Sequence, residues 1–323
     1  MTQFGQHPAP RHVIAHISDT HFLAGDRPLY GVIQTHANLV RALEQLERSG
    51  LRPSAIVFTG DLADLAEPEA YQRLRATVEP AAARMGATII WGMGNHDERL
   101  RYSVELFDQP HSAEDTGTLE TDLSPQDRVY DIDGLRIIAL DSTVPGYHHG
   151  ELTDAQLQWL SHQLATPAPH GTLLALHHPP IPTTIELLAL LELRGQSRFA
   201  DVIRGSDVRG ILAGHLHYAT SSTFAGVPVS VVAATCYTMD LSTDLHTLGG
   251  IDGGQAFNLV QVYDEQVVHS VVPIGNFATA SGFSALFLEK MTELSPAQRL
   301  EVFSRKNTTI TVADVEAGNG AAE

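Results

Sequence analysis

The sequence has one cysteine, few basic residues and no long apolar run. Cys236 has no partner for an intramolecular disulfide, and without cysteine pairs a zinc site built from thiolates is excluded. The chain has 20 Lys and Arg against 38 Asp and Glu, a formal net charge of −18, which opposes binding to nucleic acid or to an anionic membrane surface. An anionic substrate must therefore be held by positive charge that is local to its site.

No apolar stretch approaches the ~18 residues of a membrane-spanning helix, so we expect no transmembrane segment. Residues 1–11 also lack the apolar centre of a signal peptide. We therefore expect a cytoplasmic protein, and peripheral association with the cell envelope stays open. With 323 residues, 43% of them hydrophobic, the chain is long enough for one large globular α/β domain or two ordinary ones.

Strands and helices are predicted to alternate over the first two thirds of the chain. Short apolar runs, each followed by a polar turn, predict strands at 12–18, 54–59, 88–91, 135–140, 173–176 and 208–212. The spacing of apolar residues predicts helices at 32–49, 67–85, 151–164 (with Thr153 as N-cap) and 185–204. Residues 98–128 are acidic and poorly periodic, so we expect a loop or insertion there. Beyond residue 220, consecutive strands are predicted at 223–224, 227–234, 258–263 and 267–274.

This order of elements predicts an α/β fold in which two mostly mixed sheets pack face to face and helices cover their outer faces, a four-layer αββα sandwich. We assign residues 1–275 to this domain and 276–323 to a helical C-terminal extension with a flexible tail from Glu316. Short helices are expected within 284–304, one of them starting at Ser295-Pro296.

The extension is rich in apolar side chains, namely Phe283, Leu286, Phe287 and Leu288. Such side chains are costly to leave in water, so we expect the extension to pack across the mouth of the functional site. The alternative is a passive helix on the outer surface.

Ligand-type side chains stand at the ends of five predicted strands. They form the motifs Asp19-x-His21, Gly60-Asp61, Gly94-Asn95-His96-Asp97, His177 and Gly214-His215-x-His217. Each motif alone has an ordinary structural explanation, such as a capping carboxylate or a histidine buried in the core. Together, five loops that deliver carboxylate, amide and imidazole groups to the ends of strands predict a metal site.

Seven of these side chains are candidate metal ligands: Asp19, His21, Asp61, Asn95, His177, His215 and His217. The set is too large for one tetrahedral ion and suits two ions if one carboxylate bridges them. Two metals about 3.5–4 Å apart can stabilise both the attacking and the leaving oxygen of a phosphoryl transfer. The motifs therefore favour hydrolysis of a phosphate ester.

As a set, the five motifs resemble those of the calcineurin-like metallophosphoesterase superfamily. Three longer segments, 51–64, 176–182 and 214–218, further resemble the class III cyclic-nucleotide phosphodiesterases of mycobacteria. The resemblance covers residues 12–274 and leaves out the C-terminal extension. It implies a metallophosphoesterase-like fold, a binuclear metal centre, a small-molecule phosphodiester as substrate, and a homodimer.

The resemblance also implies how the ligands divide between two ions. One pocket, which usually holds iron in this family, corresponds to Asp19, His21, Asp61 and His217. The second, which commonly holds manganese, corresponds to Asp61, Asn95, His177 and His215, with Asp61 as the bridge. Other divalent ions such as zinc, cobalt or magnesium are possible in their place.

The implied reaction is hydrolysis of 3′,5′-cyclic AMP to 5′-AMP by a hydroxide that bridges the metals. Two metal ions outweigh the charges of Asp19, Asp61 and that hydroxide, so the site stays positive despite the acidic chain. Asp61 and His96 are the implied catalytic residues, His96 as the general acid that stabilises or protonates the departing sugar oxygen. Substrate contacts are implied for His21, Asp61, Asn95, His96 and His217.

Two other functions stay open. A broad-specificity or glycerophosphodiester phosphodiesterase would use the same two-metal site, because the sequence has no motif that reads a base. A non-enzymatic interaction module on this fold would have lost ligands, whereas all seven ligand positions and His96 are present. Asp64 stands where purple acid phosphatases carry a tyrosine ligand, so their colour is not expected.

Aromatic residues near the motifs are candidates for contact with a nucleobase, the alternative being surface or dimer contacts. They are Tyr147, His148, His149, Tyr218 and Tyr237. Of these we include His148 among the substrate-binding residues. Cys236 is interpreted as a small buried hydrophobe.

Overall fold

The computed structural model of the protein describes residues 3–109, 124–244 and 247–318. The chain divides into two compact units, Pro10–Gly275 and Met1–Ala9 with Asn276–Glu323. None of the helices in the described ranges combines the length and the apolar character that crossing a membrane requires.

The larger unit is built around two sheets. The first has the order β16 (Val267–Pro273), β15 (Ala256–Val262), β1 (His12–Ile17), β2 (Ala55–Thr59) and β3 (Thr88–Gly92). The second has the order β11 (Thr220–Phe224), β12 (Val227–Val231), β10 (Val208–Ala213), β8 (Thr172–Leu176), β5 (Leu135–Leu140) and β4 (Arg128–Ile132). Strands β1, β2 and β3 are parallel, and so are β5, β8 and β10. The carboxyl ends of each parallel set therefore meet at one edge of its sheet.

Strand β1 shows how alternate side chains build the layers. Ile14 belongs to an apolar cluster that includes Leu173 and Leu212 of the second sheet. Ala15 and Ile17 belong to a cluster on the opposite face, together with residues of α1 (Thr35–Arg48) and α2 (Pro68–Met85). Successive side chains of a strand point to opposite faces of its sheet, so one strand contributes to both interfaces.

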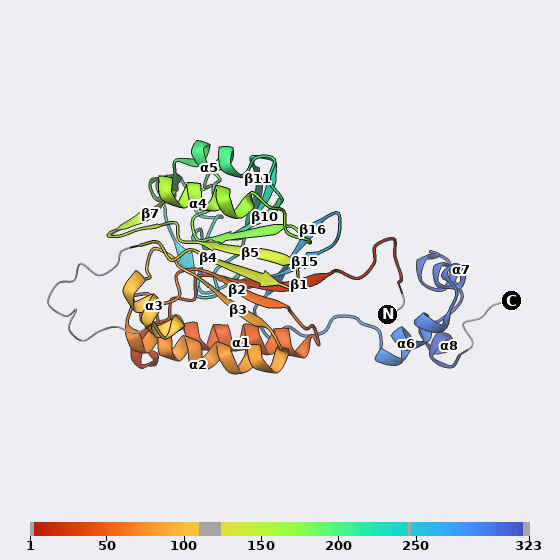
Figure 1. The fold of residues 1–323 in the computed structure, drawn as a ribbon. Helices are drawn as coiled ribbons and strands as arrows, with labels where there is room; N and C mark the ends of the chain where they lie inside the picture. The colour runs from red at the N-terminus through yellow and green to blue at the C-terminus, as the bar shows by residue number, and fades with distance from the viewer. Residues whose placement is uncertain (1–2, 110–123, 245–246, 319–323) are drawn as a thin grey trace. The chain divides into compact units, whose positions relative to one another are not determined.

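The second sheet is covered on its outer face by α4 (Asp154–Leu164) and α5 (Gln196–Ile203), with Leu160 and Phe199 in a cluster that includes Leu174. Figure 1 shows α1 and α2 on one side of the two sheets and α4 and α5 on the other. The predicted four-layer αββα sandwich is therefore confirmed. Thr153 caps α4 as expected, in a capping box with Gln156.

The loop predicted at 98–128 is wrong at both of its ends. Helix α3 (Arg99–Phe107) lies at the start, and β4 begins at Arg128. The helix buries Tyr102 and Leu106, but nine residues give too few turns for its period to stand out from the acidic sequence around it. Residues 110–123 lie outside the described part of the chain.

The helix predicted at 185–204 is replaced by three elements, the 3₁₀ helix η3 (Glu186–Leu191), β9 (Leu193–Arg194) and α5. Gly195 has a φ of 67°, which no α-helix includes, and Leu193 pairs with Gly150 of β7 (Tyr147–Glu151). Tertiary pairing thus overrides the local helical pattern. The helix predicted from residue 32 begins at Thr35 instead, so Val32 lies in the turn before it.

Short elements complete the larger unit. They are the 3₁₀ helix η1 (Ala24–Asp26), the strand β6 (Thr143–Val144), which pairs with β7, and the two-stranded pair β13 (Thr238–Met239) and β14 (Gly250–Ile251). These segments border the carboxyl ends of the central strands.

The smaller unit contains α6 (Ala285–Glu293), α7 (Pro296–Arg299), the π-helical turn η4 (Leu300–Ser304) and α8 (Val312–Glu316). Ser295 caps α7 as predicted. Phe287, Met291, Val302 and Val315 form a core of its own, whereas Phe283, Leu286 and Leu288 are exposed. Glu316, where the flexible tail is predicted to begin, belongs to α8, and residues 319–323 lie outside the described part. Packing of the extension across the functional site stays a prediction.

Candidate metal centre

Five loops bring the predicted ligands together at the carboxyl ends of the parallel strands. Asp19 and His21 follow β1, Asp61 follows β2, Asn95 and His96 follow β3, His177 follows β8, and His215 and His217 follow β10. Backbone hydrogen bonds join the loops, because Asp19 N donates to Gly60 O at 3.1 Å and Gly214 N donates to His177 O at 3.1 Å. His215 N also donates to the carboxylate oxygens of Asp19 at 3.2 Å, and this contact joins the loops of the two sheets into one framework.

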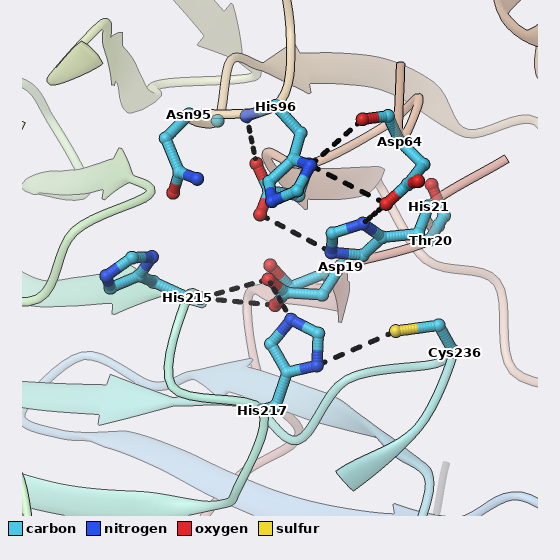
Figure 2. Close-up of polar contacts among 12 residues, drawn as sticks. Asp19, Thr20, His21, Asp64, Asn95, His96, His215, His217 and Cys236 are labelled. Atoms are coloured by element: carbon cyan, nitrogen blue, oxygen red, sulfur yellow. Dashed lines mark hydrogen bonds and ion pairs between the residues drawn. The ribbon is translucent and has the colours of Figure 1, made fainter. Parts of the chain in front are cut away.

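The first pocket contains Asp19, His21, Asp61 and His217, all of them buried, with ligand atoms that lie within 4.8 Å of one another. His217 Nε2 lies 3.4 Å from Asp19 Oδ1, and His21 Nε2 lies 3.4 Å from Asp61 Oδ2. Figure 2 shows the rings of His21 and His217 on either side of the Asp19 carboxylate.

The second pocket centres on His177 Nε2. This atom lies 3.0 Å from Asn95 Oδ1, 3.2 Å from His215 Nδ1 and 3.3 Å from Asp61 Oδ2. Asp61 Oδ2 therefore faces His177 on one side and His21 of the first pocket on the other. One carboxylate oxygen belongs to both pockets, as a bridging ligand requires.

Each candidate histidine ligand has one ring nitrogen that faces its pocket and a second, outer nitrogen that faces the surrounding protein. The hydrogen bond of the outer nitrogen determines whether the nitrogen that faces the pocket carries a proton. The outer contacts are His177 Nδ1 to Thr59 O at 2.7 Å, His217 Nδ1 to Tyr237 O at 3.2 Å, His215 Nε2 to Leu191 O at 3.1 Å and His21 Nδ1 to Asp64 Oδ1 at 2.8 Å. Carbonyl and carboxylate oxygens only accept, so each ring donates its N–H outward and a neutral ring presents a lone pair inward. Histidines that bind metals are typically held in this way.

Lone pairs consequently face one another inside the pockets. An amide oxygen, a carboxylate oxygen and an imidazole nitrogen converge on His177 Nε2, and His21 Nε2 is buried without a hydrogen-bond partner. Such atoms repel one another unless a proton or a cation lies among them. Carboxylate, amide and imidazole groups together suit hard-to-borderline metals, so these residues fit two metal ions.

The carboxylates of the centre are ionised at neutral pH. Burial opposes the ionisation of Asp61, but the charges and hydrogen bonds of His177 and His21 outweigh it and hold the pKa of Asp61 well below its ordinary value. Burial likewise opposes the ionisation of Asp19, and His217 outweighs it and lowers the pKa of Asp19 to about 2. Two negative charges are thus available to attract cations.

The two histidines of the last loop differ in protonation. Burial, with the charge of His177 adding to it, lowers the pKa of His215 to about 3, so this ring is neutral. Burial also opposes the charging of His217, but Cys236 and Asp19 outweigh it and raise the pKa of His217 to about 10.

Five of the seven candidate ligands have a positive φ. They are Asp19 (53°), His21 (45°), Asp61 (49°), His215 (71°) and His217 (56°). This conformation is uncommon for residues other than glycine and costs on the order of 1 kcal/mol each. Strain gathered on the ligands themselves indicates that the loops are built to hold these side chains in one arrangement.

A family model described as calcineurin-like phosphoesterase matches residues 12–219, the range that contains all five ligand loops. The chain belongs to this family. The family resemblance predicted from the motifs is therefore confirmed, and the matched range contains the cluster of His and Asp side chains that could hold metal ions.

The chain is also similar in sequence to phosphodiesterases of other organisms. A cAMP/cGMP dual specificity phosphodiesterase of Mycobacterium tuberculosis (strain CDC 1551 / Oshkosh) is 54% identical over 278 residues, which are 86% of this chain and 84% of the relative. A glycerophosphodiester phosphodiesterase of Enterobacter lignolyticus (strain SCF1) is 31% identical over 242 residues, which are 70% of this chain and 78% of the relative.

Among solved structures, a purple acid phosphatase from yellow lupin (Lupinus luteus) seeds is similar with a TM-score of 0.58. The likeness covers 82% of this chain and 52% of that chain at 11% sequence identity. At this identity it shows a shared phosphoesterase fold and nothing of the substrate.

Asp64 orients two histidines of this phosphoesterase centre. Its Oδ1 accepts from His21 Nδ1, and its backbone oxygen lies 2.9 Å from His96 Nδ1, as Figure 2 shows. The sequence identifies Asp64 only as the residue that replaces a tyrosine ligand. Its place on the loop after Asp61, three residues further on, is the signal that could have found the role.

Asp97 connects two ligand loops and is not itself a ligand. It is buried and accepts from Gly94 N at 2.9 Å, from Leu62 N and Ala63 N at 3.1 Å, and from Tyr71 OH at 2.9 Å. Burial, and then the charge of Asp61, raises the pKa of Asp97 to about 6. Asp97 therefore holds the loops after β2 and β3 together through their backbone N–H groups.

His148 lies at the centre, on β7. Its Nδ1 is 2.8 Å from Asn95 Nδ2, and because the amide nitrogen donates, this bond turns Asn95 Oδ1 toward His177. The contact explains how a neutral amide is held with its oxygen facing inward. A direct contact of His148 with substrate stays a prediction.

The other aromatic candidates lie in different surroundings. Tyr218 is buried, and its hydroxyl accepts from Thr184 N at 2.9 Å, so its contact with a base stays a prediction. The ring of Tyr237 lies 4.5 Å from that of His217, centroid to centroid, which puts it beside the first pocket. Cys236 is buried as predicted, but its Sγ also lies 3.7 Å from His217 Nδ1.

Two glycines of the motifs are required by close approach. A Cβ on Gly94 would overlap the backbone nitrogen and Oδ1 of Asp61, and a Cβ on Gly214 would overlap Ser18 Oγ and lie 2.7 Å from Asp19 Oδ2. Each loop can therefore reach the neighbouring carboxylate only without a side chain.

Proposed function

We propose that this protein is a cyclic-nucleotide phosphodiesterase that hydrolyses 3′,5′-cyclic AMP to 5′-AMP. The observation that carries the proposal is the convergence of seven ligand-type side chains on two pockets that share Asp61 Oδ2. The name of the relative that is 54% identical, a cAMP/cGMP dual specificity phosphodiesterase, supports the choice of substrate.

Under this proposal Asp19, His21, Asp61 and His217 hold one metal, and Asp61, Asn95, His177 and His215 hold a second. The two carboxylates of the first pocket favour the more highly charged ion, which we take to be iron, and the second pocket suits a divalent ion such as manganese. Zinc, cobalt or magnesium could substitute. When bound, such a pair stabilises charge on phosphate oxygens and lowers the pKa of water toward ~7.

The acidic chain binds an anionic phosphodiester only where local charge permits. Metals in both pockets would supply that charge, because imidazoles that bind a metal are neutral and the ionised groups among the candidate ligands are then the carboxylates of Asp19 and Asp61. His148 and Asn95 then form the half-exposed side of the site, where a phosphate can enter.

His96 is the proton donor of the proposal. Its backbone N–H donates to Asp61 Oδ1 at 2.8 Å and its Nδ1–H donates to Asp64 O at 2.9 Å, so the ring is fixed at two points. A protonated His96 then has Nε2–H left for the substrate. During hydrolysis the oxygen of water bonds to phosphorus and the water gives up one proton, while the bond from phosphorus to O3′ breaks and Nε2 gives its proton to O3′. The proton released by the water restores the protonated state of His96.

A broad-specificity or glycerophosphodiester phosphodiesterase is the second candidate. The observation in its favour is the 31% identity to the glycerophosphodiester phosphodiesterase of Enterobacter lignolyticus over 70% of this chain. The same residues would act in both reactions, so the two candidates differ only in what surrounds the phosphate.

The proposal includes the domain organisation, the location and the oligomeric state of the enzyme. Residues 1–275 would form the phosphoesterase domain and 276–323 an extension that supplies no ligand. A cytoplasmic location is supported by the single cysteine, which is free and buried, since oxidising compartments favour disulfides. Peripheral association with the cell envelope and a homodimer belong to the same proposal.

The test is a turnover panel on the purified full chain at fixed manganese. It compares 3′,5′-cyclic AMP, 2′,3′-cyclic AMP, glycerophosphoethanolamine and a phosphomonoester. The highest kcat/KM is expected for 3′,5′-cyclic AMP. A higher kcat/KM for glycerophosphoethanolamine would favour the second candidate, and hydrolysis of the monoester alone would contradict both.

A further inference from the structure

A pocket of about 350 Å³ adjoins the first metal pocket. Its wall is apolar and aromatic, and none of the described residues that form it is charged: Tyr30, Val32, Ile33, Tyr237, Met239, Leu248, Gly250 and Ile251. This volume lies within the range of small-molecule sites. The pocket therefore differs in chemistry from the metal centre beside it.

Tyr237 connects the two sites. Its backbone oxygen accepts from His217 Nδ1, and its ring packs against the ring of His217 with centroids 4.5 Å apart. A Cβ on Gly250 would lie 2.6 Å from the Tyr237 ring, so the ring rests on glycine backbone of β14 and is fixed there. Tyr237 is thus a rigid wall that continues from a metal ligand into the pocket.

Tyr30 forms the exposed part of the wall, and its ring packs edge-on against that of Tyr237 with centroids 5.6 Å apart. It lies at the tip of a tight loop in which Leu29 and Ile33 exchange two backbone hydrogen bonds of 2.9 Å. Tyr30 itself has a φ of 54°, and 69% of it is exposed, as is 67% of Val32. Beyond the contact with Tyr237, the loop leaves most of the Tyr30 ring and of Val32 in water, which is costly unless something covers them.

We propose that this pocket binds the nucleobase of the cyclic nucleotide and that Tyr30 stacks on it. The proposal rests on the proposed function and names the part of the site that distinguishes a nucleotide from a glycerophosphodiester. A base presents flat faces that stack on tyrosine and fill an apolar cleft. A glycerol group would leave its hydroxyls without partners against the same wall.

The aromatic and apolar wall of the pocket also predicts which cyclic nucleotides bind more tightly than others. A purine covers more of an aromatic ring than a pyrimidine does, so cyclic AMP and cyclic GMP are expected to bind more tightly than cyclic CMP. Without a charged group among the described lining residues, discrimination between the two purines is expected to be small.

The experiment compares two inhibitors that differ only by the base. Hydrolysis of bis(p-nitrophenyl) phosphate by the full chain is the reporter, and 5′-AMP and ribose 5-phosphate are the inhibitors. For Tyr30→Ala we expect the inhibition constant of 5′-AMP to rise about tenfold, as for the loss of one stacking ring, and that of ribose 5-phosphate to stay unchanged. Tyr30→Phe keeps the ring and is expected to restore tight binding of 5′-AMP.

A matched pair of truncations controls for general effects. Val32→Ala, in the pocket wall, is expected to weaken 5′-AMP by a smaller factor. Val129→Ala removes the same atoms from an exposed valine on β4, outside the pocket wall, and is expected to change neither inhibitor.

Three outcomes would overturn the pocket assignment. Equal weakening of both inhibitors by Tyr30→Ala would mean that the loop supports the metal centre instead. Unchanged inhibition together with a change in molecular mass on size-exclusion chromatography would assign the face to a second copy of the chain, and unchanged inhibition at constant mass would leave the base with no contact to Tyr30. If the wild type hydrolysed the reporter but no cyclic nucleotide, the proposed function would fail while the inhibitor comparison still decided the role of the pocket.

Discussion

The two metal pockets share Asp61 but differ in charge and in exposure. The first has two carboxylates and two imidazoles, and all four residues are buried. The second has only the shared carboxylate, together with an amide and two imidazoles, and its Asn95 and His215 are half-buried. At an effective dielectric constant of 20, a carboxylate 4 Å away attracts each unit of cation charge by about 4 kcal/mol. The extra carboxylate, Asp19, therefore favours the first pocket for any cation.

This difference implies that the metal ions of the two pockets would have different roles. The first pocket is enclosed, so its ion would be held as a fixed part of the structure. The second opens toward His96 and His148, so its ion would exchange more readily and would meet the substrate phosphate. Asp61 couples the two, since one oxygen faces a histidine of each pocket.

The largest effect is expected at the shared carboxylate. Asp61→Ala removes a ligand from both pockets at once, so both metals should be lost and kcat should fall by at least ~10,000-fold, a large part of the acceleration that enzymes provide. Metal analysis of the purified variant and turnover of cyclic AMP measure the two effects. Asp201→Ala, an exposed aspartate on α5, is the control and should change neither. Retention of both metals by Asp61→Ala would rule out the bridging role.

His96 belongs to neither pocket, so its removal separates proton transfer from metal binding. His96→Ala should slow hydrolysis of cyclic AMP by the ~100-fold to 10,000-fold typical of general acids, with metal content unchanged. Bis(p-nitrophenyl) phosphate should suffer much less, because nitrophenolate departs without a proton. His36→Ala, another partly exposed histidine, serves as the control. An equal loss on both substrates would assign His96 to positioning of the phosphate.

The convergence of the candidate ligands could be predicted from the sequence, whereas the groups that orient them could not. Asp19, Asp61 and His177 each directly follow an apolar run or its terminal glycine, and parallel strands of a layered sheet bring such ends together. Thr59 and Leu191 act through backbone oxygens, which every residue has, so no pattern marks them. Ligand chemistry is thus local in the sequence, while ligand orientation depends on the packing of distant loops.

The same limit applies to the base pocket and to the divided helix. Tyr30 and Gly250 contribute to one wall only because a loop with positive φ and a glycine backbone meet around Tyr237. Leu193 leaves the predicted helix because β7 offers it a strand to pair with. Both outcomes depend on contacts between segments far apart in the chain, which the periodicity of one segment does not contain.

A matched pair of ligand variants tests the asymmetry of the pockets directly. Asn95→Ala should weaken the second metal by at least the ~10-fold to 100-fold known for partners of metal ligands, and leave the first in place. Asp19→Ala should weaken the first metal and, through the bridge, the second as well. Titration with a chelator, followed by metal analysis, measures both. If Asn95→Ala lost its two metals together, the pockets would not differ in affinity as proposed. If Asp19→Ala lost only the second metal, the proposed order of affinities would be reversed.

The smallest effects are expected for residues that hold the candidate ligands by hydrogen bonds. Asp64 acts in this way on the first pocket and His148 on the second. Asp64→Asn keeps an oxygen that accepts from His21 Nδ1 but removes the charge, so the first metal should bind about tenfold more weakly, the lower end for such partners. His148→Ala frees the amide of Asn95 to rotate, so the second metal should weaken by a similar factor while the first is unaffected. The two partners act on different pockets, so their effects should be independent. In the double variant, the combined affinity for the two metals should therefore fall by the product of the two single-variant factors. A much larger loss in the double variant would mean that the pockets are coupled through their surroundings as well as through Asp61.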